Sequence, residues 1–376
     1  MNPLLVSPVT LANWRTAPFN RWGFQHVREL IPSADIANDP RRARELAVER
    51  RGLDLRIEPD SGEPLTLEQF LLATDTDALV ILHRGRLIAE HYANGMTFET
   101  PHILMSVSKS MMGLLFGSLG IDAERPVAEF VPEVRATAYA DAKVRHLLDM
   151  RAGVAFEEDY LATSGTIVEY RKATGWNALG PGDAPGDLHS FYQVLKGRDG
   201  SHGGRFHYIS TNSDLLGWVI ERATGRRYAD LMSEHLWKPI GAERSAYITV
   251  DRFGAPRCAG GMCTTARDLA RVGQWMIEHP SPWIEDLERN GDRKAWDSGS
   301  FATYFSGMPI HYRSQWYVLH GGSPLIFALG IHGQNLFIDR GNELVIAKFS
   351  SQAMPLDAPR IALTMRAVSE IRKLLA

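Results

Sequence analysis

The sequence predicts an α/β (α+β) protein, in which an antiparallel sheet is flanked by terminal helices and a helical domain is inserted into the chain. Strand patterns lie towards both ends of the chain, and segments with helical apolar spacing fill its middle. One helix-length segment is apolar on nearly every side, which indicates a helix at the centre of the molecule. We therefore predict a discontinuous sheet domain over 1–120 and 295–376, a mostly helical insertion over 121–294, and a site at their junction.

The first strands are predicted at Ala78–His83 and Arg86–Ala93, because both are rich in β-branched or alternating apolar residues. Arg84 and Gly85 between them form a two-residue hairpin turn. The apolar segment that follows, Val107–Leu119, is predicted to be the central buried helix.

The remaining elements follow from the same periodicities. Ahead of the first strands, residues 14–34 are rich in Trp, Phe, Pro and Arg and are predicted to form a strap across the body. Helical spacing recurs at Val144–Met150, Asp187–Leu195, Asp214–Ala223, Tyr228–Trp237 and Thr265–Ile277. Strands return at Gln315–Leu319, Leu325–Ile331, Asn335–Asp339 and Glu343–Ser350. The apolar face of a closing helix is formed by Ile361, Met365, Val368, Ile371 and Leu375.

The composition excludes several classes of protein. The 376 residues include 41 Lys and Arg and 44 Asp and Glu, a formal net charge of −3, which excludes a nucleic-acid binder that relies on bulk positive charge. A hydrophobic fraction of 44% can fill a core and argues against disorder. The two cysteines, Cys258 and Cys263, cannot form a disulfide framework, and no Cys/His cluster beside them indicates a zinc site.

The first residues give no targeting signal. Met1–Trp14 lacks a basic region, and Pro3 and Pro8 interrupt its apolar residues. No segment approaches the roughly 20 apolar residues that span a bilayer. We therefore expect a soluble, cytoplasmic protein without a membrane partner.

Four common catalytic or nucleotide-binding motifs are missing from the sequence: G-x-G-x-x-G, the P-loop motif, H-E-x-x-H and G-x-S-x-G. The most informative segment for chemistry is instead M-S-V-S-K-S. Ser106 and Lys109 lie three residues apart at the start of the predicted central helix, and therefore on one face. Burial would lower the pKa of Lys109, so that its neutral amine could take the Ser106 proton. The alternative is an N-cap serine followed by a solvated lysine. The apolar helix argues against that alternative, as does a possible partner motif at 206–212, F-H-Y-I-S-T-N.

Several segments together resemble the serine β-lactamase and penicillin-binding-protein superfamily, and most closely the nylon-oligomer (6-aminohexanoate-dimer) hydrolases and the family VIII-type esterases. The resemblance runs nearly end to end and keeps the order of the segments. They are WRTAPFNRWGFQHVRELIPSADI, MSVSKS, RHLLDM, FEEDYL, FHYISTNSDLLGWVIERATGRRY, AGGMCTTARDLARVGQWM, QWY and LGIHGQNLFIDR. The resemblance implies a β-lactamase-like fold.

The resemblance also implies roles for the matching positions. Ser106 would be the nucleophile and Lys109 its base, while Tyr208, in the family's Y-x-N or Y-x-S motif, would pass a proton to the leaving atom. Ser210 stands where β-lactamases have Asn and nylon-oligomer hydrolases have Ser. The backbone N–H groups of Ser106 and Ile331 would form the oxyanion hole.

The third family motif departs from the β-lactamase pattern. Ala328, Leu329 and Gly330 align with the K-T-G motif that grips a β-lactam carboxylate. Both the cationic side chain and the hydroxyl are missing here. The departure argues against penicillin as the physiological substrate and favours esters or amides that lack that carboxylate.

Three further positions correspond to residues near the substrate in the family, and a fourth lies beside the predicted oxyanion hole. Tyr160 matches a tyrosine on a loop that closes over substrate, and Ala259 replaces a polar residue. Arg171 stands where the best dimer hydrolases place an Asp facing the substrate amine, so it could favour an anionic substrate or simply face solvent. His332, next to the predicted oxyanion hole, is either a site residue or a structural histidine. Three aromatic residues either line an acyl pocket or fill the core: Trp176, Trp316 and Tyr317.

We therefore expect a serine hydrolase that cleaves a small ester or amide through an acyl-enzyme on Ser106, without a metal or organic cofactor. Either Tyr208 or Lys109 would be the base for deacylation. The alternatives are a true β-lactamase or D-amino-acid peptidase, and a catalytically silent binding module with the same fold. The expected partner is a small-molecule substrate and not nucleic acid; a homodimer is possible, since the sequence leaves the oligomeric state open.

Overall fold

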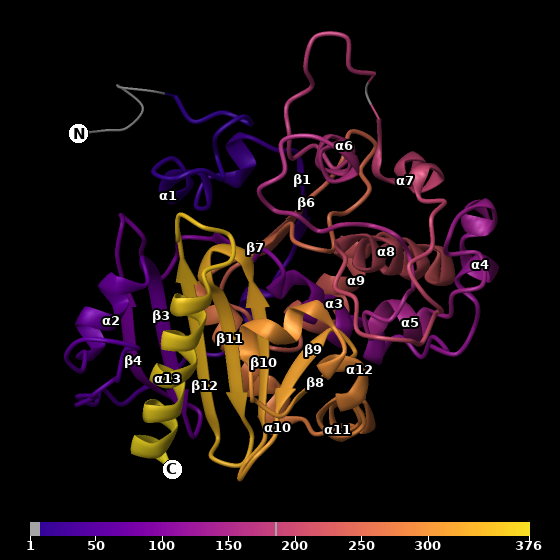
Figure 1. Cartoon of the computed structure of the whole chain (residues 1–376). Coiled ribbons are helices and arrows are strands. Elements are labelled where there is room, and N and C mark those ends of the chain that lie inside the picture. Colours follow the sequence, from indigo (N-terminus) through magenta and orange to yellow (C-terminus); the bar gives the residue numbers. More distant parts are fainter. Residues whose placement is uncertain (1–7, 185) are drawn as a thin grey trace.

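The computed structural model describes residues 8–184 and 186–376, which are organised around two sheets (Figure 1). The larger sheet has eight strands in the order β2-β4-β3-β12-β11-β10-β9-β8. They are β2 (Ala47–Val48), β3 (Thr76–His83), β4 (Arg86–Tyr92), β8 (Ile310–Arg313), β9 (Trp316–Leu319), β10 (Leu325–Gly330), β11 (Gln334–Asp339) and β12 (Leu344–Ser350). In this sheet only β2 pairs in parallel, with β4. The predicted antiparallel sheet is therefore confirmed.

Alternate residues of the larger sheet face two separate apolar cores, as the period of two along a strand requires. In β12, Leu344 and Ile346 belong to the core that includes the C-terminal helix α13 (Ala358–Leu375). Val345, between them, belongs to the core that includes α10 (Ala266–Glu278). Figure 1 shows α13 running along one face of the sheet. Because both faces are covered, β12 is buried along its whole length.

A smaller sheet, which the sequence analysis did not predict, leads into the site. Its order is β1-β6-β7-β5. Its strands are β1 (Ser33–Ile36), β5 (His102–Ile103), β6 (Ala246–Thr249) and β7 (Met262–Thr264). Strands of two to four residues are too short to show an alternating pattern, which explains why they were missed.

The helices match the predicted order. The central helix is α3 (Val107–Ser118), and ten of its twelve residues are buried. The helices before it are α1 (Asn20–Gly23) and α2 (Leu67–Ala73). Those after it are α4 (Val127–Phe130), α5 (Val144–Leu148), α6 (Thr166–Ala173), α7 (Leu188–Phe191), α8 (Ser210–Thr224), α9 (Tyr228–Met232), α11 (Pro282–Arg289) and α12 (Arg293–Asp297). None of the helices in the described residues has the length and apolar character that crossing a membrane requires.

The middle of the chain is less separate from the sheets than the predicted insertion over 121–294 suggests. Helix α10, inside that range, packs against β3, β11 and β12 of the larger sheet. Within the same range, β6 pairs with β1 and β7 pairs with β5. The cause is the amphipathic α10, whose apolar side is needed to cover one face of the sheet. The division into 1–120, 121–294 and 295–376 stays a prediction.

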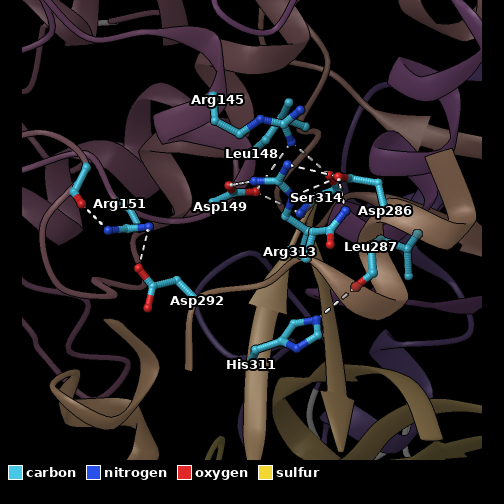
Figure 2. A network of polar contacts seen from close by, with 12 residues as sticks. Arg145, Leu148, Asp149, Arg151, Asp286, Leu287, Asp292, His311, Arg313 and Ser314 are labelled. Atoms are coloured by element: carbon cyan, nitrogen blue, oxygen red, sulfur yellow. Dashed lines mark hydrogen bonds and ion pairs between the residues drawn. The ribbon is translucent and has the colours of Figure 1, made fainter. Parts of the chain in front are cut away.

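A polar network fastens the helical part to the edge of the larger sheet (Figure 2). Asp149, just after α5, accepts hydrogen bonds from Arg313 Nη1 at 2.8 Å and from the Ser314 backbone N–H at 2.9 Å. The Nε of Arg313 donates to Asp286 of α11, also at 2.8 Å. Burial raises the pKa of Asp149, whereas Arg313 and Arg145 act to lower it. The network therefore depends on both arginines to offset the burial of one carboxylate.

The turn between β8 and β9 joins three helices. Its two residues, Ser314 and Gln315, have φ of 52° and 70°, as a type I′ hairpin turn requires. The Gln315 backbone N–H donates to the end of α5 at 2.9 Å. Ser110 of α3 donates to its carbonyl at 2.7 Å, and Ser213 of α8 donates to its Oε1 at 2.8 Å. Gly113 of α3 lets the turn approach, because a Cβ there would lie 2.2 Å from the Ser314 carbonyl oxygen.

Candidate active site

Ser106 is the N-cap of α3, three residues after β5 ends. Met105, just before it, has φ of 46°, a left-handed conformation that non-glycine residues seldom adopt. The turn leaves Ser106 half-buried, while the helix residues that follow it are buried. The local backbone therefore presents the Ser106 hydroxyl at the surface of the core, and strain of this kind is typical of functional sites.

Lys109, one turn further along α3, directs its amine back to Ser106. Its Nζ lies 2.9 Å from Ser106 Oγ, 3.2 Å from Ser210 Oγ and 2.7 Å from the Ala259 carbonyl oxygen. The side chain is buried, and burial lowers the pKa of Lys109 to about 7, against an opposing effect of the Glu158 carboxylate. The alternative of a solvated lysine at this position is therefore wrong.

Tyr208 faces the same point from the segment that precedes α8. Its ring stacks on Phe301 with the centroids 5.2 Å apart and lies 4.9 Å from Lys109 Nζ. Burial raises the pKa of Tyr208 above its ordinary value, and the interaction of its hydroxyl with Ser106 opposes that shift only in part. The phenol therefore keeps its proton over the neutral pH range.

Glu158 is a site residue that the sequence analysis missed. Its carboxylate accepts the Ser210 backbone N–H at 2.7 Å and the Ser210 hydroxyl at 2.5 Å. Since Ser210 also accepts from Lys109, the three side chains form one chain of hydrogen bonds. The three consecutive acidic residues ahead of Tyr160 were the only sequence signal for this site residue. They do not indicate that Glu158 pairs with Ser210, because the two residues lie 52 apart in the chain.

A second missed group positions the carbonyl that accepts the Lys109 hydrogen bond. Asp214 of α8 accepts the Ala259 backbone N–H at 2.7 Å. The same carboxylate is paired with Arg257 and accepts the hydroxyl of Tyr170, and all three side chains are buried. Ala259, predicted as a substrate-facing position, thus also orients Lys109 through its backbone.

Three depressions meet at these residues. The first, which we call the apolar hollow, has a volume of about 590 Å³ and is lined by Ser106, Tyr160, Tyr208, Phe301, Tyr317, Leu329, Phe337 and Met365, among others. The second, the arginine hollow, has about 390 Å³ and is lined by Ser106, Tyr160, Arg15, Ile167, Arg171, Trp176, Arg257 and Ala259, among others. The third, the acidic groove, is lined by Glu157, Glu158, Asp159, Tyr160, Asp199, Tyr208 and Tyr304, among others. Both hollows open beside Ser106 and Tyr160.

Some of the remaining predicted residues line the two hollows, and others are buried away from them. Ile331 lines both hollows together with Ser106, so the two predicted oxyanion donors lie at one place. Arg171 is 6% exposed and does not face solvent. His332 is buried, with its Nδ1 2.7 Å from the Gln352 carbonyl oxygen, and lines neither hollow. Trp316 is also in the core.

The described residues contain no group of three or more His, Cys, Asp or Glu side chains placed to hold a metal ion. Cys258 and Cys263 are both buried and free.

A family model described as Beta-lactamase matches residues 67–369. The chain belongs to the beta-lactamase family. The 6-aminohexanoate-dimer hydrolase of Paenarthrobacter ureafaciens is 37% identical to this chain over 360 residues, which is 92% of this chain and 89% of the relative. The predicted resemblance is thus confirmed, and the chain is a hydrolase of the serine β-lactamase superfamily.

Solved structures agree on the beta-lactamase fold. A Bacillus anthracis structure named for the same dimer hydrolase superposes with a TM-score of 0.86 at 26% identity and covers 97% of both chains. A D-stereospecific amidohydrolase from Streptomyces superposes with a TM-score of 0.58 at 18% identity, over 77% of this chain and 94% of its own. EstCE1, described as a hydrolase with promiscuous acyltransferase activity, superposes with a TM-score of 0.60 at 16% identity, over 80% of this chain and 97% of its own. The last two show the fold alone.

Proposed function

We propose that this beta-lactamase family hydrolase cleaves a small ester or amide through an acyl-enzyme on Ser106. The observation that carries the proposal is the buried amine of Lys109, 2.9 Å from Ser106 Oγ and with a pKa lowered to about 7. A neutral amine at that distance can act as a general base at ordinary pH. Removing the Ser106 proton turns a weak nucleophile into an effective one.

Acylation then follows from the placement of these groups. Lys109 takes the proton as Ser106 Oγ bonds to the substrate carbonyl carbon. The backbone N–H groups of Ser106 and Ile331 are the proposed donors to the oxyanion that forms. As the carbon–oxygen or carbon–nitrogen bond breaks, the leaving atom receives a proton from Tyr208, which burial keeps protonated. Lys109 returns its proton to Tyr208, so that the charges balance.

Water completes the cycle by attacking the acyl carbon, which releases the acid and regenerates the Ser106 hydroxyl. Lys109 is the preferred base for this step, because its pKa lies near 7 while that of Tyr208 is raised. Neither half of the reaction requires a metal or an organic cofactor.

The positions of the three depressions suggest how a substrate lies. Tyr208 lines the apolar hollow and the acidic groove but is not part of the wall of the arginine hollow. A leaving group protonated by Tyr208 would therefore depart on the side of the apolar hollow or the acidic groove, and the acyl group would occupy the arginine hollow. In this orientation Arg171 would meet the acyl group, and an ammonium there would be repelled.

We accordingly expect short-chain esters to be cleaved readily and both 6-aminohexanoate dimer and penicillins to be poor substrates. Ala328 and Leu329 stand where a β-lactamase has the cation and the hydroxyl that grip the β-lactam carboxylate, and Leu329 lines the apolar hollow with an apolar side chain. A true β-lactamase or D-amino-acid peptidase is thus the weaker alternative. Turnover of nitrocefin at a rate comparable with that of p-nitrophenyl butyrate would favour that alternative.

The decisive variant is Ser106→Ala. We expect its rate with p-nitrophenyl butyrate to fall by about 10³-fold or more, and the intact mass of the wild type, but not of the variant, to increase after treatment with a fluorophosphonate. Ser118→Ala, at an exposed position near the end of the same helix, is the matched control. Wild-type protein that neither reacts with the fluorophosphonate nor cleaves esters would instead identify a silent binding module.

A further inference from the structure

The arginine hollow carries positive charge that the surrounding carboxylates do not balance. Three arginines line it, and one of them, Arg257, is paired with the buried Asp214. Within residues 8–184 and 186–376, neither Arg15 nor Arg171 forms an ion pair with a carboxylate; both donate to neutral oxygen atoms. Largely buried cations without a counter-ion are costly, so their presence beside a nucleophile requires an explanation.

Arg15 is held in place without being neutralised. Its Nη2 donates to the Asn177 side-chain oxygen at 2.5 Å. Its guanidinium carbon lies 5.5 Å from the ring centroid of Trp14 and 5.7 Å from that of Trp176. Burial, with repulsion from Arg171 and Arg257, lowers the pKa of Arg15 to about 9. The surroundings therefore fix the guanidinium and supply no negative charge.

Arg171 retains hydrogen-bonding capacity. Its Nη1 donates to the Ala162 carbonyl oxygen at 3.0 Å and its Nη2 to the Asp159 carbonyl oxygen at 2.8 Å. These bonds use two of the five N–H donors of a guanidinium. Glu158 also lines the hollow, but its two carboxylate oxygens accept the backbone N–H and the hydroxyl of Ser210. Burial lowers the pKa of Arg171 overall, although the Glu158 charge acts to raise it, and both Glu158 oxygens bind Ser210, so no ion pair with Arg171 forms.

We propose that Arg15 and Arg171 together bind a carboxylate at the far end of the acyl group, so that the preferred substrates are monoesters or monoamides of dicarboxylic acids. The proposal rests on the proposed function for the orientation of the substrate. A carboxylate accepts charge-assisted hydrogen bonds from guanidinium groups, and it would supply the charge that both arginines lack. The indole of Trp176, in the wall of the same hollow, would pack on the methylene chain between the two ends of the acyl group.

The test compares two esters that differ only at the far end of the acyl group: mono-p-nitrophenyl adipate and p-nitrophenyl hexanoate. We expect kcat/KM of the wild type to be at least about tenfold higher for the adipate ester, and Arg15→Gln to bring this ratio close to one. Arg15→Lys, which keeps the charge, should retain part of the preference. Arg21→Gln, on the same N-terminal segment but outside the hollow, should leave the ratio unchanged.

A binding measurement separates this inference from the proposed function. We expect Ser106→Ala to bind monomethyl adipate about tenfold more tightly than methyl hexanoate in calorimetry, and the added substitution Arg15→Gln to remove the difference. Selective binding without turnover by the wild type would support the carboxylate site and contradict the ester hydrolase. Turnover of both esters at equal rates, or a ratio that Arg15→Gln and Arg171→Gln both leave unchanged in folded protein, would overturn the carboxylate site.

Discussion

In the proposed mechanism, the protonation state of Lys109 sets the pH range in which Ser106 can react. The base must be neutral, and burial lowers the pKa of Lys109 to about 7. We therefore expect kcat/KM for a neutral ester to increase with pH through a midpoint near 7. Because burial raises the pKa of Tyr208, loss of its proton should cause no decrease below about pH 10. A pH profile measured at constant ionic strength checks both limits, and a flat profile between pH 5 and 9 would contradict the assignment of Lys109.

Glu158 provides a way to move that midpoint. Its carboxylate raises the pKa of Lys109 against the effect of burial. Glu158→Gln removes the charge but keeps a side chain able to meet Ser210, so the pKa of Lys109 should decrease and the midpoint should move to lower pH. Glu157→Gln, at the exposed neighbouring position, should leave the midpoint in place. A shift to higher pH in Glu158→Gln would show that the carboxylate acts in another way.

The role of Tyr208 is best tested with leaving groups of different basicity. A nitrophenolate can leave without a proton, whereas an alkoxide or an amine anion cannot. Tyr208→Phe should therefore reduce kcat/KM for an alkyl ester or an anilide by about 10²-fold or more, and much less for the p-nitrophenyl ester of the same acid. Tyr304→Phe, in the wall of the acidic groove, is the matched control. Equal losses on both leaving groups would indicate that Tyr208 only shapes the site.

At the scale of elements, the close packing of the β8–β9 turn against α3 requires that residue 113 has no side chain. A Cβ at Gly113 would lie 2.2 Å from the Ser314 carbonyl oxygen, which is far inside van der Waals contact. Gly113→Ala should thus displace the turn that Ser110 and Ser213 hold, lowering the free energy of unfolding by about 1–3 kcal/mol and reducing activity as well. Urea denaturation and the esterase rate measure the two effects. Ser118→Ala, exposed on the same helix, should change neither, and a Gly113→Ala protein of normal stability would contradict this account.

At the scale of the whole molecule, the network of Figure 2 connects the helical part to the sheet edge. Asp149→Asn removes the buried charge that Arg313 and Arg145 offset, so we expect a loss of about 1–3 kcal/mol in the free energy of unfolding. Asp141→Asn removes an exposed partner of Arg198 and should cost less than about 1 kcal/mol. Similar losses in urea denaturation of the two variants would show that the network does not join the two parts.

The main elements of the larger sheet and its helices could be predicted from the sequence because their periodicity is strong. The hairpin of β3 and β4, the buried α3 and the run from β9 to α13 all lie where the pattern indicated. The smaller sheet could not be predicted, since its strands are too short to show a pattern. The motif containing Ser106 and Lys109 identified the centre of the candidate site. Glu158 and Arg15 were missed because their importance depends on distant contacts, such as those of Arg15 with Asn177 and Trp176.

The pairing of β3 with β12 places strands from near the two ends of the chain side by side in the larger sheet. Sequence separations this long make folding slow, because a large loop must close before the contact can form. During synthesis, Ser106 and α3 emerge well before Ile331 and β12. The nascent chain must therefore keep an apolar central helix without β9 to β12 until these strands have been made. Until then it is exposed to aggregation, and a nascent chain that has not reached Ile331 lacks one of the two proposed oxyanion donors.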